Sequence, residues 1–182
     1  MKRGNLTIIA GTYALDPAHT SIGFVARHAM ITKVRGNFTE FEGTLTVGEN
    51  INESAATATV KTASIDTNNA DRDAHVKNED FFDVEKCPEM TFTATTFDVN
   101  EQGEGTVTGD LTIKGTTKSV NFKVEEAGVA EDPFGNTRLG FEAKTSINRT
   151  DFGIDFNAPL KTGGVLVSEE IKIELEVSAI KQ

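Results

Sequence analysis

Residues 71–82 read Asp-Arg-Asp-Ala-His-Val-Lys-Asn-Glu-Asp-Phe-Phe, and they interrupt a chain that otherwise alternates between polar and apolar residues. The flanking sequence places Val, Ile and Phe at every second position, which is the period of half-buried β-strands. An asparagine at 68 or 69 can cap a short helix, and the aspartates that follow suit a helix N-terminus. The stretch therefore predicts a short helical plug with a charged outer face, whose Phe81 and Phe82 point into the space that the strands enclose.

The alternating segments on either side of this plug predict about eight β-strands. Within residues 35–47 the apolar positions change parity, since Phe38 and Phe41 are an odd number of residues apart. A bulge near Thr39 and Glu40 would reconcile the two halves and bend the strand as a closing barrel requires. The predicted strand segments are 13–16, 21–27, 35–47, 54–65, 90–99, 106–114, 120–124, 137–148 and 165–180.

Long antiparallel strands in a chain of 182 residues favour an all-β fold, an eight-stranded closed or nearly closed barrel in a single domain over 1–182. Residues 1–11 are expected to form a poorly ordered N-terminal extension. Small residues, namely Ala55, Ala56, Ala58 and Ala63, stand where a packed core would carry Leu or Ile, so the barrel can hold an elongated apolar ligand. A β-sandwich, in which the small residues face bulky ones, is the alternative.

The composition excludes several classes of protein. With 28 acidic and 18 basic residues the net charge is −10, which argues against a nucleic-acid-binding protein and against firm docking on anionic lipid. The lone Cys87 can form no intrachain disulfide and has no metal-ligand spacing. The apolar run at 6–10 is too short for an export segment, and no span of about 20 apolar residues occurs. We expect a cytoplasmic protein that does not insert stably into a membrane. The sequence leaves a homodimer as one candidate oligomeric state.

Chemistry-bearing residues are few. The three histidines, His19, His28 and His75, could form a metal or acid–base site with nearby aspartates, but no HxH or HExxH spacing supports one. They are better explained as hydrogen-bonding residues at strand ends. Arg72 and Arg149 can pair with neighbouring carboxylates, or donate to a phosphate or quinone oxygen of a ligand head group. No nucleophile-elbow or phosphate-loop motif is present.

Seven motifs in order show a resemblance to a known family, and they extend from Tyr13 to about Val177. The chain resembles the YceI-like, polyisoprenoid-binding family of lipocalin-like barrels. The motifs are Tyr13-x-Leu15-Asp16-x-x-His19-x-Ser21-Ile22-x-Phe24 with His28 following, Gly36-x-Phe38-x-x-Phe41-x-Gly43, Ser64-Ile65-x-Thr67, Arg72-Asp73-x-His75 with Asp80-Phe81-Phe82-Asp83, Pro88-x-x-x-Phe92, Gly109-x-Leu111-Thr112-Ile113-x-Gly115-Thr116-Thr117, and Arg149-x-Asp151-Phe152-Gly153.

The resemblance implies a non-enzymatic barrel that needs no cofactor or metal and buries a long isoprenoid tail, such as that of a quinone or polyprenyl phosphate, with the head group near the opening. The residues expected to line the tunnel or its opening are Phe24, Phe38, Phe41, Phe81, Phe82, Phe92, Leu111, Phe122, Phe141 and Phe152. The polar candidates near the opening are His19, His28, Arg72, His75 and Arg149. The alternatives are a metal-assisted hydrolase that uses the histidines, and a stress-response interaction module with a filled core.

Overall fold

The computed structural model describes residues 9–29, 31–157 and 167–182, and these form an all-β barrel with one short α-helix. The strands are β1 (Gly11–Leu15), β2 (Ser21–His28), β3 (Thr32–Phe38), β4 (Phe41–Val47), β5 (Ala55–Lys61), β6 (Ile65–Asp66), β7 (Glu89–Val99), β8 (Gly105–Ile113), β9 (Thr116–Glu131), β10 (Thr137–Asn148) and β11 (Glu170–Lys181). The helices are η1 (Ile51–Glu53), η2 (Thr62–Ser64), α1 (Ala70–Lys77) and η3 (Arg149–Phe152).

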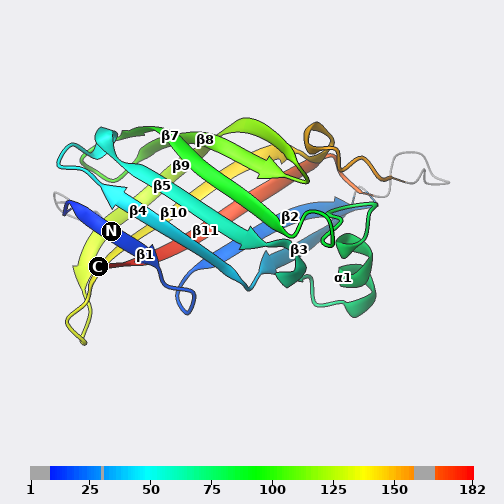
Figure 1. The fold of residues 1–182 in the computed structure, drawn as a ribbon, viewed down its shortest axis with the longest axis horizontal. Coiled ribbons are helices and arrows are strands. Elements are labelled where there is room, and N and C mark those ends of the chain that lie inside the picture. Colours follow the sequence, from blue (N-terminus) through cyan, green and yellow to red (C-terminus); the bar gives the residue numbers. More distant parts are fainter. Residues whose placement is uncertain (1–8, 30, 158–166) are drawn as a thin grey trace.

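The barrel is closed by a strand pair from the two ends of the chain. The antiparallel strands follow the order β1-β4-β5-β7-β8-β9-β10-β11, and β11 then pairs with β1 through Tyr13↔Lys181 and Leu15↔Ala179. This closure confirms the eight-stranded antiparallel barrel and excludes the sandwich. In Figure 1 the strands run obliquely along the length of the barrel, with both described ends of the chain at one end and α1 at the other.

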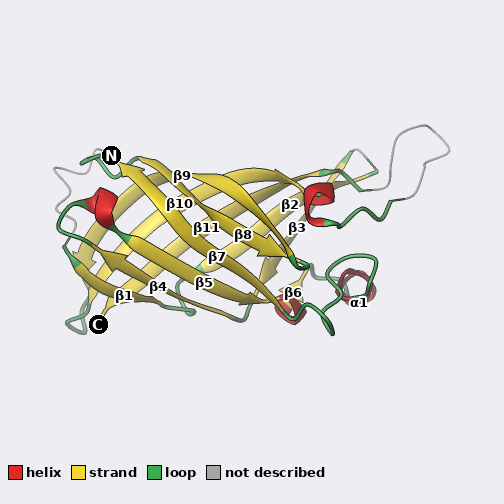
Figure 2. Ribbon diagram, turned by 45° about the horizontal axis from the view of Figure 1, so that its top comes forward, coloured by secondary structure: helices red, strands yellow, loops and turns green. Residues whose placement is uncertain are grey.

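The three remaining strands lengthen the barrel toward α1. β2 pairs with the first half of β11, as β1 pairs with its last residues, so β1 and β2 act as one strand interrupted by a turn. β3 continues β4 in the same way, and β6 continues β5. Eleven segments thus make eight barrel strands, and Figure 2 shows β2, β3 and β6 at the α1 end.

The predicted bulge site is where two adjacent strands are interrupted together. β3 ends at Phe38 and β4 begins at Phe41, while η2 interrupts the neighbouring strand. Across the gap, the Thr39 N–H donates to the Ser64 carbonyl at 3.2 Å and the Lys61 N–H donates to the Glu40 carbonyl at 2.9 Å. The backbone therefore stays paired through the irregularity, which changes the parity of the apolar residues and keeps both halves facing inward.

The helical plug is confirmed, although the helix itself is shorter than the predicted stretch. The Asn69 side chain accepts the Arg72 N–H at 2.9 Å and caps α1, which ends at Lys77. Phe81 and Phe82 follow in a turn, where the Phe82 N–H donates to the Val76 carbonyl at 3.1 Å. Both rings pack on the main core cluster, which contains Phe38 and Phe152.

Besides the interrupted strand at 35–47, three predicted strands have other bounds in the structure, and the strand expected over 120–124 extends over Thr116–Glu131 as β9. The strand expected over 54–65 breaks at η2, and the last strand begins at Glu170 rather than near 165. Residues 158–166 lie outside the described part of the chain. Val167 and Ser168 precede β11 because they bond elsewhere: the Val167 N–H donates to Asn157 Oδ1 at 3.1 Å, and the Ser168 Oγ accepts the Arg27 N–H at 2.9 Å.

Candidate functional site

An apolar cavity of about 700 Å³ occupies the interior of the barrel. It reaches from Val47, Val99 and Leu139 near the chain termini to Arg72 and His75 of α1. Most of its lining consists of Phe, Ile, Leu, Val and Ala side chains. A protein interior normally leaves few voids larger than a water molecule, and a space of this size has the dimensions of a ligand-binding cavity.

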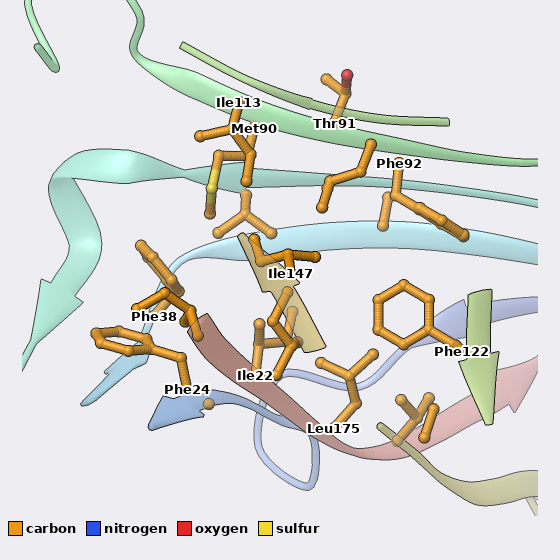
Figure 3. A pocket seen from close by; sticks show the side chains of 18 of the residues that line it. Ile22, Phe24, Phe38, Met90, Thr91, Phe92, Ile113, Phe122, Ile147 and Leu175 are labelled. Carbon is orange, nitrogen blue, oxygen red and sulfur yellow. The ribbon is translucent and has the colours of Figure 1, made fainter. Parts of the chain in front are cut away.

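On β10 and β11, the side chains that face the interior are those at the apolar positions of the sequence alternation. Leu139, Phe141 and Ala143 of β10 line the cavity, as do Ile173 and Leu175 of β11. Their neighbours in the sequence, such as Lys172 and Glu174, are exposed and belong to the opposite face. Figure 3 shows side chains from opposite walls, including Ile22, Phe92 and Phe122, directed into the same space.

Small residues keep the cavity open. Ala56 and Ala58 of β5 line it where larger side chains would fill it. Two phenylalanine rings lie over glycines: a Cβ built on Gly36 would come within 2.4 Å of the Phe24 ring, and a Cβ on Gly109 would come within 2.4 Å of the Phe92 ring. Since only glycine lets each ring lie against the wall, these glycines hold the aromatic area out of the centre of the barrel.

The α1 end carries the charged and histidine side chains of the lining. The His75 ring packs edge-on against Phe81 and Phe156, with 5.0 Å between ring centroids in each pair. Its Nε2 lies 3.0 Å from Asp80 Oδ2. Arg72 donates from Nε to Thr67 Oγ1 at 2.9 Å and from Nη2 to the Thr67 carbonyl at 2.6 Å, so its guanidinium is held beside the cavity.

Arg149 is a buried cation on the cavity wall, with 4% of its surface exposed. It donates to the carbonyls of Ser168, Ile154 and Val167 at 2.8, 2.7 and 3.2 Å. Among the described residues, which include every Asp and Glu of the chain, no carboxylate lies within ion-pair distance of it. Burial lowers the pKa of Arg149. Carbonyl dipoles therefore take the place of a counter-ion, and the carboxylate partner that was one expectation for Arg149 is absent.

An ion-pair network joins the β1–β2 turn to the β9–β10 hairpin on the outside of the barrel. Arg138 contacts Asp16 and Asp132, each at 2.7 Å. The bond from Arg138 is the main reason that the pKa of each aspartate falls to about 2. Arg138 Nη1 also donates to Ser178 Oγ of β11 at 3.2 Å, so the network fastens the strand pair that closes the barrel.

Two of the fifteen predicted site residues are not part of the cavity wall. His19 lies in the β1–β2 turn, largely exposed, with Nδ1 2.7 Å from Asp16 Oδ2. Phe41 packs against the main core cluster without lining the cavity. The structure places the other predicted residues on the wall: Phe24, Phe38, Phe81, Phe82, Phe92, Leu111, Phe122, Phe141, Phe152, His28, Arg72, His75 and Arg149.

The prediction omitted much of the aliphatic wall. Ile22, Ile147 and Ile171 line the cavity, as does Phe156, which follows η3. The alternation in β2, β10 and β11 was the signal for the isoleucines, whereas Phe156 lies in an irregular segment where no period applies. In the described part of the chain, no three His, Cys, Asp or Glu side chains are placed to hold a metal ion. None of the helices described there is long and apolar enough to cross a bilayer.

Comparison with known proteins identifies the relatives of this chain. The YceI-like domain pattern matches residues 13–179. A UPF0312 protein of Staphylococcus epidermidis is 40% identical over 164 residues, covering 89% of this chain and 93% of the relative.

Two solved structures share the fold. The YCEI protein of Campylobacter jejuni superposes with a TM-score of 0.74 at 31% identity, covering 86% of this chain and 90% of that protein. A polyisoprenoid-binding domain from Saccharophagus degradans superposes with a TM-score of 0.70 at 12% identity, covering 96% of this chain and all (100%) of that domain. With the domain pattern extending over nearly the whole barrel, this chain belongs to the YceI-like family.

Proposed function

We propose that this protein binds a long-chain isoprenoid lipid inside the barrel and carries or stores it without catalysing a reaction. The observation that carries the proposal is the apolar cavity of about 700 Å³. The family supports it, because one structural neighbour is described as a polyisoprenoid-binding domain. The lipid is the only small molecule that the proposal requires.

The cavity volume sets the length of tail that fits. A methylene group occupies about the volume of a water molecule, roughly 30 Å³, so the cavity holds about 20 carbon atoms, or about four isoprene units. Burying a five-carbon unit is worth about 4 kcal/mol before ordering costs. If ordering the unit removes half of this, each unit strengthens binding by about 2 kcal/mol, or about 30-fold.

The polar lining supports placement of the head group at the α1 end. Arg72, His75 and Arg149 line the cavity there, whereas the opposite end is lined mainly by aliphatic residues such as Val47 and Leu139. Arg72 is partly exposed and can donate to a phosphate or quinone oxygen. A quinone or polyprenyl phosphate whose tail lies along the barrel meets both requirements.

Two measurements test this function. Mass spectrometry of an organic extract of the purified protein should find an isoprenoid near one per chain. With delipidated protein, the dissociation constants of geraniol, farnesol and geranylgeraniol should fall about 30-fold per added unit, and longer polyprenols should gain little more. An empty extract together with no dependence on tail length would remove the proposed function and leave the barrel as described.

A further inference from the structure

The β2–β3 hairpin is a local exception to the acidic character of the chain. Between Asp16 and Glu40 the sequence contains no acidic residue, although the net charge is −10. The hairpin instead carries three basic residues, Arg27, Lys33 and Arg35, all of them exposed. We call these three residues together with Ile31 the basic lip.

The cations of the basic lip are poorly neutralised within the protein. Arg27 and Lys33 are directly opposed in the β2–β3 register, and like charges in this position destabilise a sheet. Within the described residues, which hold all the carboxylates of the chain, neither of them has an ion-pair partner. Arg35 has one exposed partner, Glu174, at 3.7 Å. Two opposed, unneutralised cations indicate a surface that meets an external anionic partner.

The tip of the hairpin adds an exposed apolar side chain. Ile31 is 80% exposed, and its backbone is fixed because its N–H donates to the His28 carbonyl at 3.2 Å and its carbonyl accepts from Arg27 Nη1 at 3.4 Å. An apolar side chain among cations suits the interface of an anionic bilayer. The apolar side chain enters the head-group region, and the cations contact the lipid phosphates. Among the described residues, Phe134 is the other large apolar side chain that is strongly exposed, and it lies beside Asp132, so it lacks this combination.

The position of the basic lip connects it to the cavity. Arg27, His28 and Val34 of the same hairpin line the cavity at the α1 end. His28 also bridges to Val167, another lining residue. Figure 1 shows β2 and β3 extending to the end of the barrel that carries α1, away from the chain termini. A bilayer bound to the basic lip would therefore face the end of the barrel where the proposed head group lies.

We propose that the basic lip docks the α1 end of the barrel onto an anionic lipid bilayer, so that an isoprenoid tail passes between membrane and cavity. The passage of lipid rests on the proposed function, whereas the docking rests on the hairpin alone. Residues 71–86 at the same end contain six acidic and three basic side chains, which oppose close approach of α1 itself and leave the contact to the hairpin. The net charge of −10 keeps this contact transient.

Vesicle flotation tests the docking. We expect the full chain to float with vesicles of phosphatidylcholine and phosphatidylglycerol in equal amounts, not with phosphatidylcholine alone, and to be released at about 1 M salt. Each basic residue at an anionic surface strengthens binding about fivefold, so R27Q/K33Q should bind about 25-fold more weakly. The control K123Q/K144Q changes the net charge equally on another part of the barrel and should bind like the wild type.

The outcomes separate the two proposals. Equal vesicle binding by R27Q/K33Q and the control, or no wild-type binding to the anionic vesicles, overturns the docking. Native mass spectrometry with geranylgeraniol, without vesicles, measures tail binding independently. We expect K33Q and the control K123Q/K144Q, which leave the cavity wall unchanged, to bind it like the wild type. If the wild type floats but binds no isoprenoid, the lipid-carrier function fails and the docking stands.

Discussion

Enlarging two alanines of β5 tests whether the barrel interior is empty space or filled core. Ala56 and Ala58 line the cavity, and Ala58 lies between Gly43 of β4 and Phe92 of β7 in the sheet register. The double substitution A56L/A58L adds six carbon atoms, or about 180 Å³ at roughly 30 Å³ per methylene-sized group. Against a cavity of about 700 Å³, this removes about a quarter of the space.

The variant should become more stable and bind its ligand more weakly. Each added leucine buries three carbons in space that exists already, worth about 2.4 kcal/mol, of which ordering the side chain cancels about 1 kcal/mol. The free energy of unfolding of the empty protein should therefore rise by about 1–3 kcal/mol. The lost volume corresponds to about one isoprene unit, so the affinity for geranylgeraniol should fall about 30-fold while farnesol binding changes much less.

Chemical denaturation of delipidated protein and calorimetric titration with both alcohols measure these two effects. Ala55, exposed on the opposite face of the same strand, provides the control: A55L makes the same change without touching the cavity and should leave binding unchanged. A filled core predicts the reverse result, because overpacking destabilises a protein by about 1–3 kcal/mol. A destabilised A56L/A58L variant would refute the reasoning from cavity volume.

Three further predictions concern single residues. In G36A the Phe24 ring must move away from the new Cβ, because the ring lies 2.4 Å from the position of that atom. We expect a ring displacement of about 1 Å, measurable by crystallography, and a loss of about 1 kcal/mol in the free energy of unfolding, measurable by denaturation. Arg138 lowers the folded-state pKa of Asp132 from 3.8 to about 2. The contribution of Asp132 to stability is therefore complete above its unfolded pKa and is lost as the pH falls from about 4 toward 2. Across that window the denaturant midpoints of D132N should decline less steeply than those of the wild type, and parallel curves would contradict this. Replacing Arg149 with Met removes its hydrogen bonds to the Ser168 and Ile154 carbonyls, while the Val167 carbonyl keeps its bond from Asn157 Nδ2. The free energy of unfolding in urea titrations should fall by about 3 kcal/mol, whereas a loss below about 1 kcal/mol would show that these bonds are dispensable.

The sequence predicted the parts of this protein that depend on short-range pattern. The strand expected over 137–148 is β10 without a change at either end, and the change of parity near Thr39 located a real interruption of the strand. The Asn69 cap and the plug could be predicted because a helix cap involves residues only a few positions apart. Ordered motifs in the chain also indicated the YceI-like family, which the domain pattern confirms.

The candidate site was predicted less completely, because its residues come together only through long-range packing. Alternation identifies two faces of a strand, but the sequence leaves open which face points inward until the neighbouring strands are known. His19 was predicted to lie near the opening because it belongs to a family motif, yet the turn that holds it pairs it with Asp16 outside the cavity. Phe156 joins His75 and Phe81 from an irregular segment, so no periodic signal could place it.

The sequence by itself determined the strand periodicity, the capped plug and the family, since each depends on residues that are close along the chain. Only the tertiary structure decided that β11 closes the barrel on β1, that the apolar parity encloses a cavity, and that β2 and β3 carry uncompensated cations to its α1 end. The physical reason is the range of the interactions. The pairing of Tyr13 with Lys181, or of like charges across a hairpin, depends on the pairing of whole strands, which local composition does not specify.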